Sequence, residues 1–359
     1  MVLLQKIVSP LQSIWGSKEK PLKPRISVVP KGLLLEKEFP RGFHIYGITE
    51  GPKKGGQIML GAGNPQTSLG AVFLGGGDGR WEQVDLPEET ALLSQFLQLP
   101  NGKFVSGGMN SIGRAALLLG DPTAKEWESV NVDLHAYSSI SSLILLKNRT
   151  ILASSGQMIT QGKTKPILFS SSDDGTTWQK EEFKLPISVF QTFELLSDGT
   201  IFAGTAGDMA PTLYCSKDGA KTWEPLPPFP MYKTYKMQAV RMVEGRLFVV
   251  LWGYKTDIAE RVVRLYVSSP DFQTWEELPP IEDIHFIFSF LVSKDFTFYA
   301  GTEKGRVYRS QDRGKTWRRI AQFQTNIGAY TIHEDTIGRI WLGKDYVDSV
   351  DFSLWRLQD

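Results

Sequence analysis

The chain has 359 residues, and its 40 lysines and arginines nearly balance 39 aspartates and glutamates. The formal net charge of +1 gives no overall attraction to nucleic acid or to an anionic membrane surface, so we expect neither as a partner. The single cysteine, Cys215, excludes an internal disulfide framework and fits a reducing compartment, which favours the cytoplasm.

Residues 1–32 are predicted to form an N-terminal segment and linker ahead of the folded domain. Apolar residues in 1–15 recur at near-helical spacing, but Lys6 and Pro10 interrupt them, which favours a short docking helix over a surface anchor or a signal peptide. The following "GSKEKPLKP" is typical of a linker. Because no stretch reaches the roughly 20 apolar residues that a membrane span requires, we expect no transmembrane segment.

From residue 33 onward the chain is predicted to be a single repetitive domain, 33–359. Six tryptophans recur at intervals of 42 to 52 residues: Trp81, Trp127, Trp178, Trp223, Trp275 and Trp317. Seven short apolar runs, several of them after a glycine turn, keep the same phase: 58–60, 104–105, 151–153, 201–203, 247–250, 298–300 and 340–342. A fixed period of this length indicates one supersecondary unit used repeatedly.

Each unit is predicted to contain four strands, for example 139–146, 150–154, 167–170 and 178–183. Short strands at this period without helical stretches favour an all-β, seven-bladed β-propeller of four-stranded antiparallel blades. The last unit supplies only three strands after Trp317, whereas "LLLEKEFP" at 33–40 precedes the first unit. We therefore expect the N-terminal strand to complete the last blade, which leaves no open sheet edge.

The turn before several of the tryptophans has a defined pattern. "SSSDDGTTW" at 170–178 and "SQDRGKTW" at 310–317 carry Ser, Asp, Gly, Thr and Trp at fixed offsets, and "SKDGAKTW" and "SSPDFQTW" are decayed copies. This pattern resembles the Asp-box of the sialidase-type, or BNR-repeat, β-propeller superfamily. Ser171 and Asp173 are expected to bond backbone N–H groups of the turn, and Gly175 to supply its backbone angle. The pattern therefore indicates a fold and not a chemistry.

A ligand of such a propeller is expected where the innermost strands begin and where the second and third strands connect, because these segments converge on the axis. Aromatic and imidazole side chains there favour stacking on a sugar or packing on a protein segment. The predicted ligand-binding residues are Arg41, His44, Asn110, Arg114, Tyr137, Tyr235, Tyr254 and His285. A metal site held by histidines is the alternative, and it is not expected, because the order of the blades separates the histidines.

The resemblance to sialidases also suggests catalytic candidates. "FELLSDGTIFAG" resembles the family's glutamate strand and gives Glu194, "GAYTIHEDTIGRIWLG" resembles its tyrosine strand and gives Tyr330, and Asp208 is a nearby carboxylate. Arg41 lies near the position of the first substrate arginine, but the arginine that should follow the glutamate strand is absent from "TAGDMAPTLYC". Without three arginines a sialic acid carboxylate loses its bidentate clamp.

Three functions consequently remain open. The first is binding of a glycan or a protein segment at the axial mouth by a monomer without a cofactor. The second is glycoside hydrolysis by Glu194, Asp208 and Tyr330, since paired carboxylates can act as acid and as base or nucleophile. The third is a protein assembly scaffold, because seven-bladed Asp-box relatives include both polysaccharide hydrolases and photosystem assembly factors.

Overall fold

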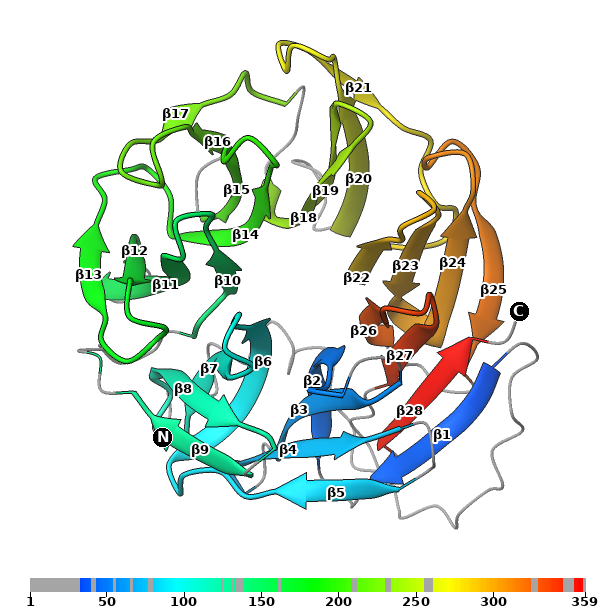
Figure 1. Ribbon diagram of the computed structural model, residues 1–359. Helices are drawn as coiled ribbons and strands as arrows, with labels where there is room; N and C mark the ends of the chain where they lie inside the picture. The colour runs from blue at the N-terminus through cyan, green and yellow to red at the C-terminus, as the bar shows by residue number, and fades with distance from the viewer. Residues whose placement is uncertain are drawn as a thin grey trace.

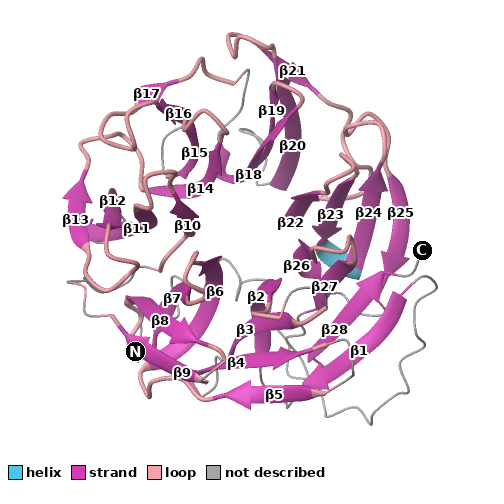
Figure 2. Ribbon diagram, viewed as in Figure 1, coloured by secondary structure: helices cyan, strands magenta, loops and turns pink. Residues whose placement is uncertain are grey.

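The computed structural model describes residues 33–39, 43–53, 56–64, 67–76, 80–123, 125–130, 132, 139–160, 163–207, 212–229, 234–254, 261–323, 329–344 and 352–357. Within these ranges the regular elements are β-strands, apart from one turn of 3-10 helix, η1 (Glu303–Gly305) (Figure 2). The prediction of an all-β chain is therefore confirmed. The predicted segment 1–32 lies outside the described residues.

Antiparallel pairing between consecutive strands forms five sheets of four strands and one sheet of eight. The first three sheets are β2 (His44–Glu50) to β5, with β3 (Ile58–Asn64), β4 (Leu69–Gly75) and β5 (Trp81–Val84); β6 (Thr90–Gln98) to β9, with β7 (Phe104–Asn110), β8 (Ala115–Asp121) and β9 (Glu126–Ser129); and β10 (Ser142–Leu145) to β13, with β11 (Ile151–Thr160), β12 (Lys163–Ser171) and β13 (Gln179–Glu182).

The eight-stranded sheet contains β14 (Val189–Leu195), β15 (Ile201–Ala206), β16 (Leu213–Ser216), β17 (Glu224–Pro225), β18 (Thr234–Val243), β19 (Arg246–Tyr254), β20 (Arg261–Ser268) and β21 (Trp275–Glu277). The next sheet contains β22 (Ile287–Val292), β23 (Phe298–Thr302), β24 (Arg306–Ser310) and β25 (Arg318–Gln322). The last sheet contains β26 (Ala329–Glu334), β27 (Ile340–Lys344), β28 (Phe352–Leu357) and β1 (Leu33–Phe39).

The two ends of the described chain meet in this last sheet. Strand β1 pairs antiparallel with β28, with Leu35 opposite Trp355 and Phe39 opposite Phe352. Glu36 on β1 accepts a hydrogen bond of 2.6 Å from Arg356 Nε on β28. Strand β1 is therefore an edge strand of the sheet that β26, β27 and β28 form.

The sheets stand around a common centre (Figure 1). The innermost strands are β2, β6, β10, β14, β18, β22 and β26. Apolar side chains fill the space between neighbouring sheets. In one cluster, Phe248 and Val267 of β19 and β20 pack with Phe290 and Phe298 of β22 and β23. Each sheet therefore contributes both faces to a core, which explains why its central strands are apolar throughout and do not alternate.

The Asp-containing turn between β12 and β13 has the geometry that its sequence predicts. Gly175 N donates to Ser171 Oγ at 2.9 Å, and Thr177 donates to Asp173 through its backbone N and its hydroxyl at 2.9 and 2.6 Å. The Thr177 bonds lower the pKa of Asp173 to about 2. Gly175 has φ of +87°, a value that favours glycine. The predicted role of these residues within their own turn is confirmed.

A decayed copy keeps this geometry without the glycine. Ala220 stands at the glycine position of the turn between β16 and β17, with φ of +71°, and its N–H donates to Ser216 Oγ at 2.9 Å. Thr222 binds Asp218 through its hydroxyl and backbone N at 2.6 and 3.0 Å. The serine, aspartate and threonine therefore maintain the turn even where the glycine is lost.

Candidate functional site

One contact identifies the end of the sheets at which the Asp-containing turns lie. Arg149, in the turn between β10 and β11, forms an ion pair of 2.9 Å with Asp174 in the turn between β12 and β13. Turns after the innermost strands thus share an end of their sheet with the Asp-containing turns. The beginnings of the innermost strands lie at the other end, which we call the mouth end.

Three aromatic side chains gather at the mouth end, where β22 begins. Trp252 near the end of β19 meets Phe286 edge to face, with 5.1 Å between ring centroids, and Phe286 lies 4.4 Å from the Phe288 ring. All three are half-buried, so each keeps part of its surface available. Half-buried rings offer a large apolar contact area to a ligand.

Two polar side chains of β18 lie beside this aromatic cluster. Met237 packs into the core that β18 shares with β15 and β16, so Lys236 and Gln238 on either side of it project the other way. Gln238 Nε2 donates to Phe288 O at 2.7 Å, whereas its buried Oε1 has no hydrogen-bond partner among the described residues. The side chain is therefore anchored through Nε2, while Oε1 is buried without a described partner.

Lys236 lies opposite Trp252 in the pairing of β18 with β19. No described residue forms a hydrogen bond or ion pair with its ammonium, and burial lowers the pKa of Lys236. Part of the side chain surface is still exposed, so the lysine is enclosed by protein but not sealed from solvent. An anionic or carbonyl group of a ligand would relieve the cost of burying this cation.

His285 is held at the same place by its backbone. Its N–H donates to Glu303 Oε1 at 2.8 Å, and Glu303 N donates to Phe286 O at 3.3 Å, which ties η1 to the segment before β22. The imidazole itself is exposed. Among the predicted ligand-binding residues, His285 is the one that the described structure brings to the aromatic cluster.

Asn110 and Arg114 lie at a separate part of the mouth end, in the turn from β7 to β8. Asn110 Oδ1 accepts hydrogen bonds from the backbone N of Ile112 and Arg114 at 3.2 and 2.8 Å, so the amide oxygen is used to shape the turn. The exposed Arg114 guanidinium has no partner among the described side chains. Both residues line a hollow of about 360 Å³, with Glu89, Thr90 and Val130.

The structure describes the remaining predicted residues of the mouth end to different extents. His44 begins β2, and its ring stacks on Tyr46 with 6.0 Å between centroids. Arg41, Tyr137 and Asp208 lie outside the described residues, and for Tyr235, Tyr254 and Tyr330 the structure describes the strand position but not the side chain. Their predicted roles in ligand binding or catalysis stay predictions.

Glu194 is placed away from the aromatic cluster. It is the sixth residue of seven in β14, close to the turn after that strand, whereas His44 is the first residue of β2. Glu194 Oε1 accepts a hydrogen bond of 2.8 Å from Met242 N on β18, and Oε2 lies 3.9 Å from Arg241 Nη1. Burial raises the pKa of Glu194, and Arg241 and the Met242 N–H oppose this rise only in part.

The sequence analysis did not predict Lys236, Gln238, Trp252 and Phe288 as residues of the site. A signal existed in "HFIFSF", where Phe286 and Phe288 alternate with other residues at the start of a strand. Lys236 and Gln238 flank an apolar residue in the same way. Their meeting with Phe288 depends on packing between β18 and β22, which no local pattern contains.

No protein-family model and no curated protein matches the chain. None of the helices in the described part of the chain is long and apolar enough to cross a membrane.

Solved structures of β-propellers are similar to this fold over most of its length. YCF48 bound to D1 peptide has a TM-score of 0.64 at 14% identity, covering 93% of this chain and 99% of that chain. The WD40 β-propeller domain of Doa1 has a TM-score of 0.62 at 9% identity, with coverages of 91% and 97%. The GH74 xyloglucanase from Xanthomonas campestris has a TM-score of 0.60 at 14% identity, with coverages of 91% and 56%. At these identities the similarity establishes a β-propeller fold and nothing finer.

Proposed function

We propose that this chain is a seven-bladed propeller of the Asp-box superfamily whose mouth end binds a protein segment. The eight-stranded sheet supports this count, because a single residue pair, Ala206 with Lys236, joins its two halves of four strands. The last blade would then consist of β26 to β28 and β1, so that the N-terminal strand closes the ring. Residues 33–359 would form one domain and act as a monomer.

One observation carries the functional part of the proposal: half-buried Trp252, Phe286 and Phe288 lie beside two polar groups without described partners, Lys236 Nζ and Gln238 Oε1. A peptide presents apolar side chains together with backbone N–H and C=O groups. Gln238 Oε1 can accept from the N–H, Lys236 can donate to the C=O, and the rings can cover an apolar side chain. Protein interfaces favour this combination of aromatic area and a few fixed polar groups.

The comparison with known folds is compatible with this proposal. YCF48 has been solved with a D1 peptide, and it is similar to this chain over nearly its whole length. This similarity supports the proposal that a propeller of this size can bind a peptide. The residues of the aromatic cluster would then determine which peptide this chain binds. Such binding is also what a protein assembly scaffold requires.

A glycoside hydrolase is the second candidate, and one feature favours it. Burial raises the pKa of Glu194, a property that general acids of glycosidases share. The carboxylate is nevertheless engaged by Met242 N, and it lies toward the other end of its strand from the mouth. If Glu194→Gln and Asp208→Asn leave a measurable hydrolysis of aryl glycosides unchanged, this candidate is eliminated.

The proposal is tested by panning a displayed library of random peptides against the protein and titrating the selected peptides by fluorescence anisotropy. We expect Phe286→Ala and Lys236→Met each to weaken binding about tenfold, since each removes a central contact of the cluster. Phe296→Ala is the matched control, because Phe296 is an exposed ring in the turn at the far end of β22. It should change affinity less than about twofold.

The same three variants separate the alternatives. A panel of oligosaccharides is titrated in parallel, because aromatic rings also stack on sugars. Selected peptides that bind Phe286→Ala and the unaltered protein equally would overturn the mouth as a peptide site, and failure to select any peptide would do so too. If the unaltered protein binds an oligosaccharide and Phe286→Ala abolishes this binding, the ligand of the mouth end is a glycan and not a protein segment.

A further inference from the structure

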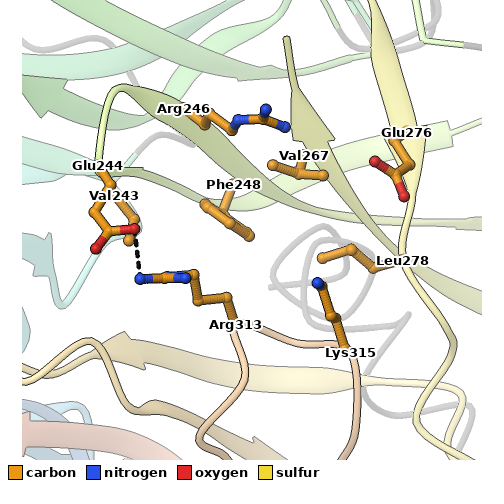
Figure 3. A pocket seen from close by; sticks show the side chains of 9 residues that line it. All are labelled: Val243, Glu244, Arg246, Phe248, Val267, Glu276, Leu278, Arg313 and Lys315. Carbon is orange, nitrogen blue, oxygen red and sulfur yellow. Dashed lines mark ion pairs between the residues drawn. The ribbon is translucent and has the colours of Figure 1, made fainter. Parts of the chain in front are cut away.

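A second pocket lies between neighbouring sheets at the end that carries the Asp-containing turns (Figure 3). Its volume is about 370 Å³, and strands β18 to β21 form one wall while the turn between β24 and β25 forms the other. The floor is apolar and consists of Val243, Phe248, Val267 and Leu278, all buried members of one core cluster. A volume of this size admits a small molecule.

The rim of this pocket is charged. Arg313 forms an ion pair of 2.5 Å with Glu244, which commits one cation and one carboxylate to each other. Arg246 and Lys315 are exposed, and no described residue forms an ion pair or hydrogen bond with either side-chain cation. Figure 3 shows these two cations on opposite sides of the apolar floor, with Glu276 at a further edge. Among the described residues, these two cations and the carboxylate of Glu276 have no side-chain partner.

The position of Lys315 is fixed by the turn that carries it. Arg313 and Gly314 have φ of +60° and +86°, and Asp312 Oδ1 accepts from Thr316 N at 2.8 Å. A Cβ atom added at Gly314 would lie 3.1 Å from Leu278 Cδ1, so the turn is packed directly on the pocket floor. A backbone held in this way places Lys315 at the rim, so that only its side chain is ordered on binding.

We propose that this pocket binds a small monocarboxylate with a compact apolar body. The apolar body would cover Phe248, Val267 and Leu278, and the carboxylate would accept hydrogen bonds from Arg246 or Lys315 at the rim. The ion pair between Arg313 and Glu244 closes one side, and Glu276 disfavours a second negative charge on the ligand. This site is separate from the aromatic cluster at the mouth end, and it does not depend on the peptide proposal.

The proposal is tested with 4-phenylbutyrate as the probe, by isothermal titration of the full chain. We expect saturable one-to-one binding, and binding at least tenfold weaker for 4-phenylbutanol, which keeps the apolar body and lacks the charge. At least one of Arg246→Gln and Lys315→Gln should weaken 4-phenylbutyrate about fivefold, because it removes the cation that the carboxylate binds while leaving the floor intact. Glutarate, which has a charge at both ends and no ring, should bind more weakly than 4-phenylbutyrate.

Arg318→Gln is the matched control, because Arg318 is an exposed arginine at the start of β25 that does not line the pocket. It should bind like the unaltered chain, and so should Phe286→Ala, which changes only the mouth end. Circular dichroism and thermal unfolding verify that each variant is folded. The proposal is overturned if 4-phenylbutyrate does not bind at millimolar concentration, if the alcohol binds equally well, or if folded Arg246→Gln and Lys315→Gln keep full affinity.

Discussion

Glu194 is a catalytic candidate from its sequence, but its buried side chain forms a contact that stabilises the fold. Its carboxylate connects β14 with β18 through Met242 N, in the space where the sheet β14–β17 meets the next strands. At the positions of β6 and β10 that precede the strand end in the same way, Leu97 and Ile144 pack into apolar cores. Glu194 thus replaces an aliphatic contact with a hydrogen bond, and burial of its charge raises its pKa.

The first prediction concerns the pH dependence that this burial creates. A carboxyl with a pKa raised in the folded state holds its proton when the unfolded chain has lost it, so stability falls as pH rises through and above about 4.5. We expect Glu194→Gln to reduce the loss of unfolding free energy between about pH 4.5 and pH 8. Urea unfolding at several pH values measures this loss.

The control for this prediction is Glu128→Gln, since Glu128 is an exposed side chain on β9. It should leave the slope of stability against pH unchanged. An equal slope for Glu194→Gln and the unaltered chain would show that the buried carboxyl costs the fold nothing.

The sequence predicts Glu194 as a site residue because its segment resembles a glutamate strand. The hydrogen bond from Met242 N could not be predicted, because the two residues are 48 positions apart in the chain.

At the scale of elements, the turns were the most predictable feature. The pattern of Ser, Asp, Gly and Thr is local, and each side chain bonds within five residues, so the sequence contains nearly the whole structure of the turn. Strand extents were less predictable: the unit expected at 150–154 and 167–170 has its central strands at Ile151–Thr160 and Lys163–Ser171. The added residues pair with each other beyond the apolar run that marked the strand.

The second prediction separates two costs of replacing a turn glycine by alanine, namely backbone strain and the steric contact of the added methyl group. Gly175 and Gly199 have similar φ, +87° and +96°, but a Cβ atom at 175 would lie 2.8 Å from Val105 Cγ2, and one at 199 would meet nothing within 4 Å. Gly199→Ala should lower the free energy of unfolding by about 1 kcal/mol through backbone strain alone. Gly175→Ala should lower it by about 1 to 3 kcal/mol more, because the added methyl overpacks the contact with β7.

Chemical denaturation of both alanine variants provides the comparison, with the midpoint and the slope fitted together. Equal destabilisation would mean that Val105 moves aside at no cost. In that case the turn would be joined to the neighbouring sheet less firmly than the 2.8 Å approach indicates.

At the scale of the whole molecule, the period of the tryptophans and apolar runs was sufficient to predict a propeller, because each unit repeats the same local arrangement. The mouth end was predictable only as a location. Its aromatic cluster lies on β19 and at the start of β22, and Lys236 and Gln238 of β18 project toward it according to how Met237 enters the core. Such side-chain directions result from packing between sheets, which a repeat period does not encode.

The third prediction tests whether the pairing of β1 with β28 holds the ring together. Strand β1 contributes buried Leu33 and Phe39 to two different core clusters, and it covers the edge of β28 over six paired residues. Deleting residues 1–39 should therefore lower the free energy of unfolding by about 3 to 6 kcal/mol from the two side chains alone. It should also expose an unpaired strand edge, which favours association between chains.

A chain that lacks only residues 1–32 is the control, because it retains β1 entire. Thermal unfolding gives the stability of both deletions, and size-exclusion chromatography with light scattering gives their masses. We expect the longer deletion to unfold at lower temperature and to form oligomers or aggregates, while the control stays a monomer. If both deletions unfold alike and remain monomeric, the other strands keep the ring intact on their own, and the N-terminal strand is an accessory to the fold.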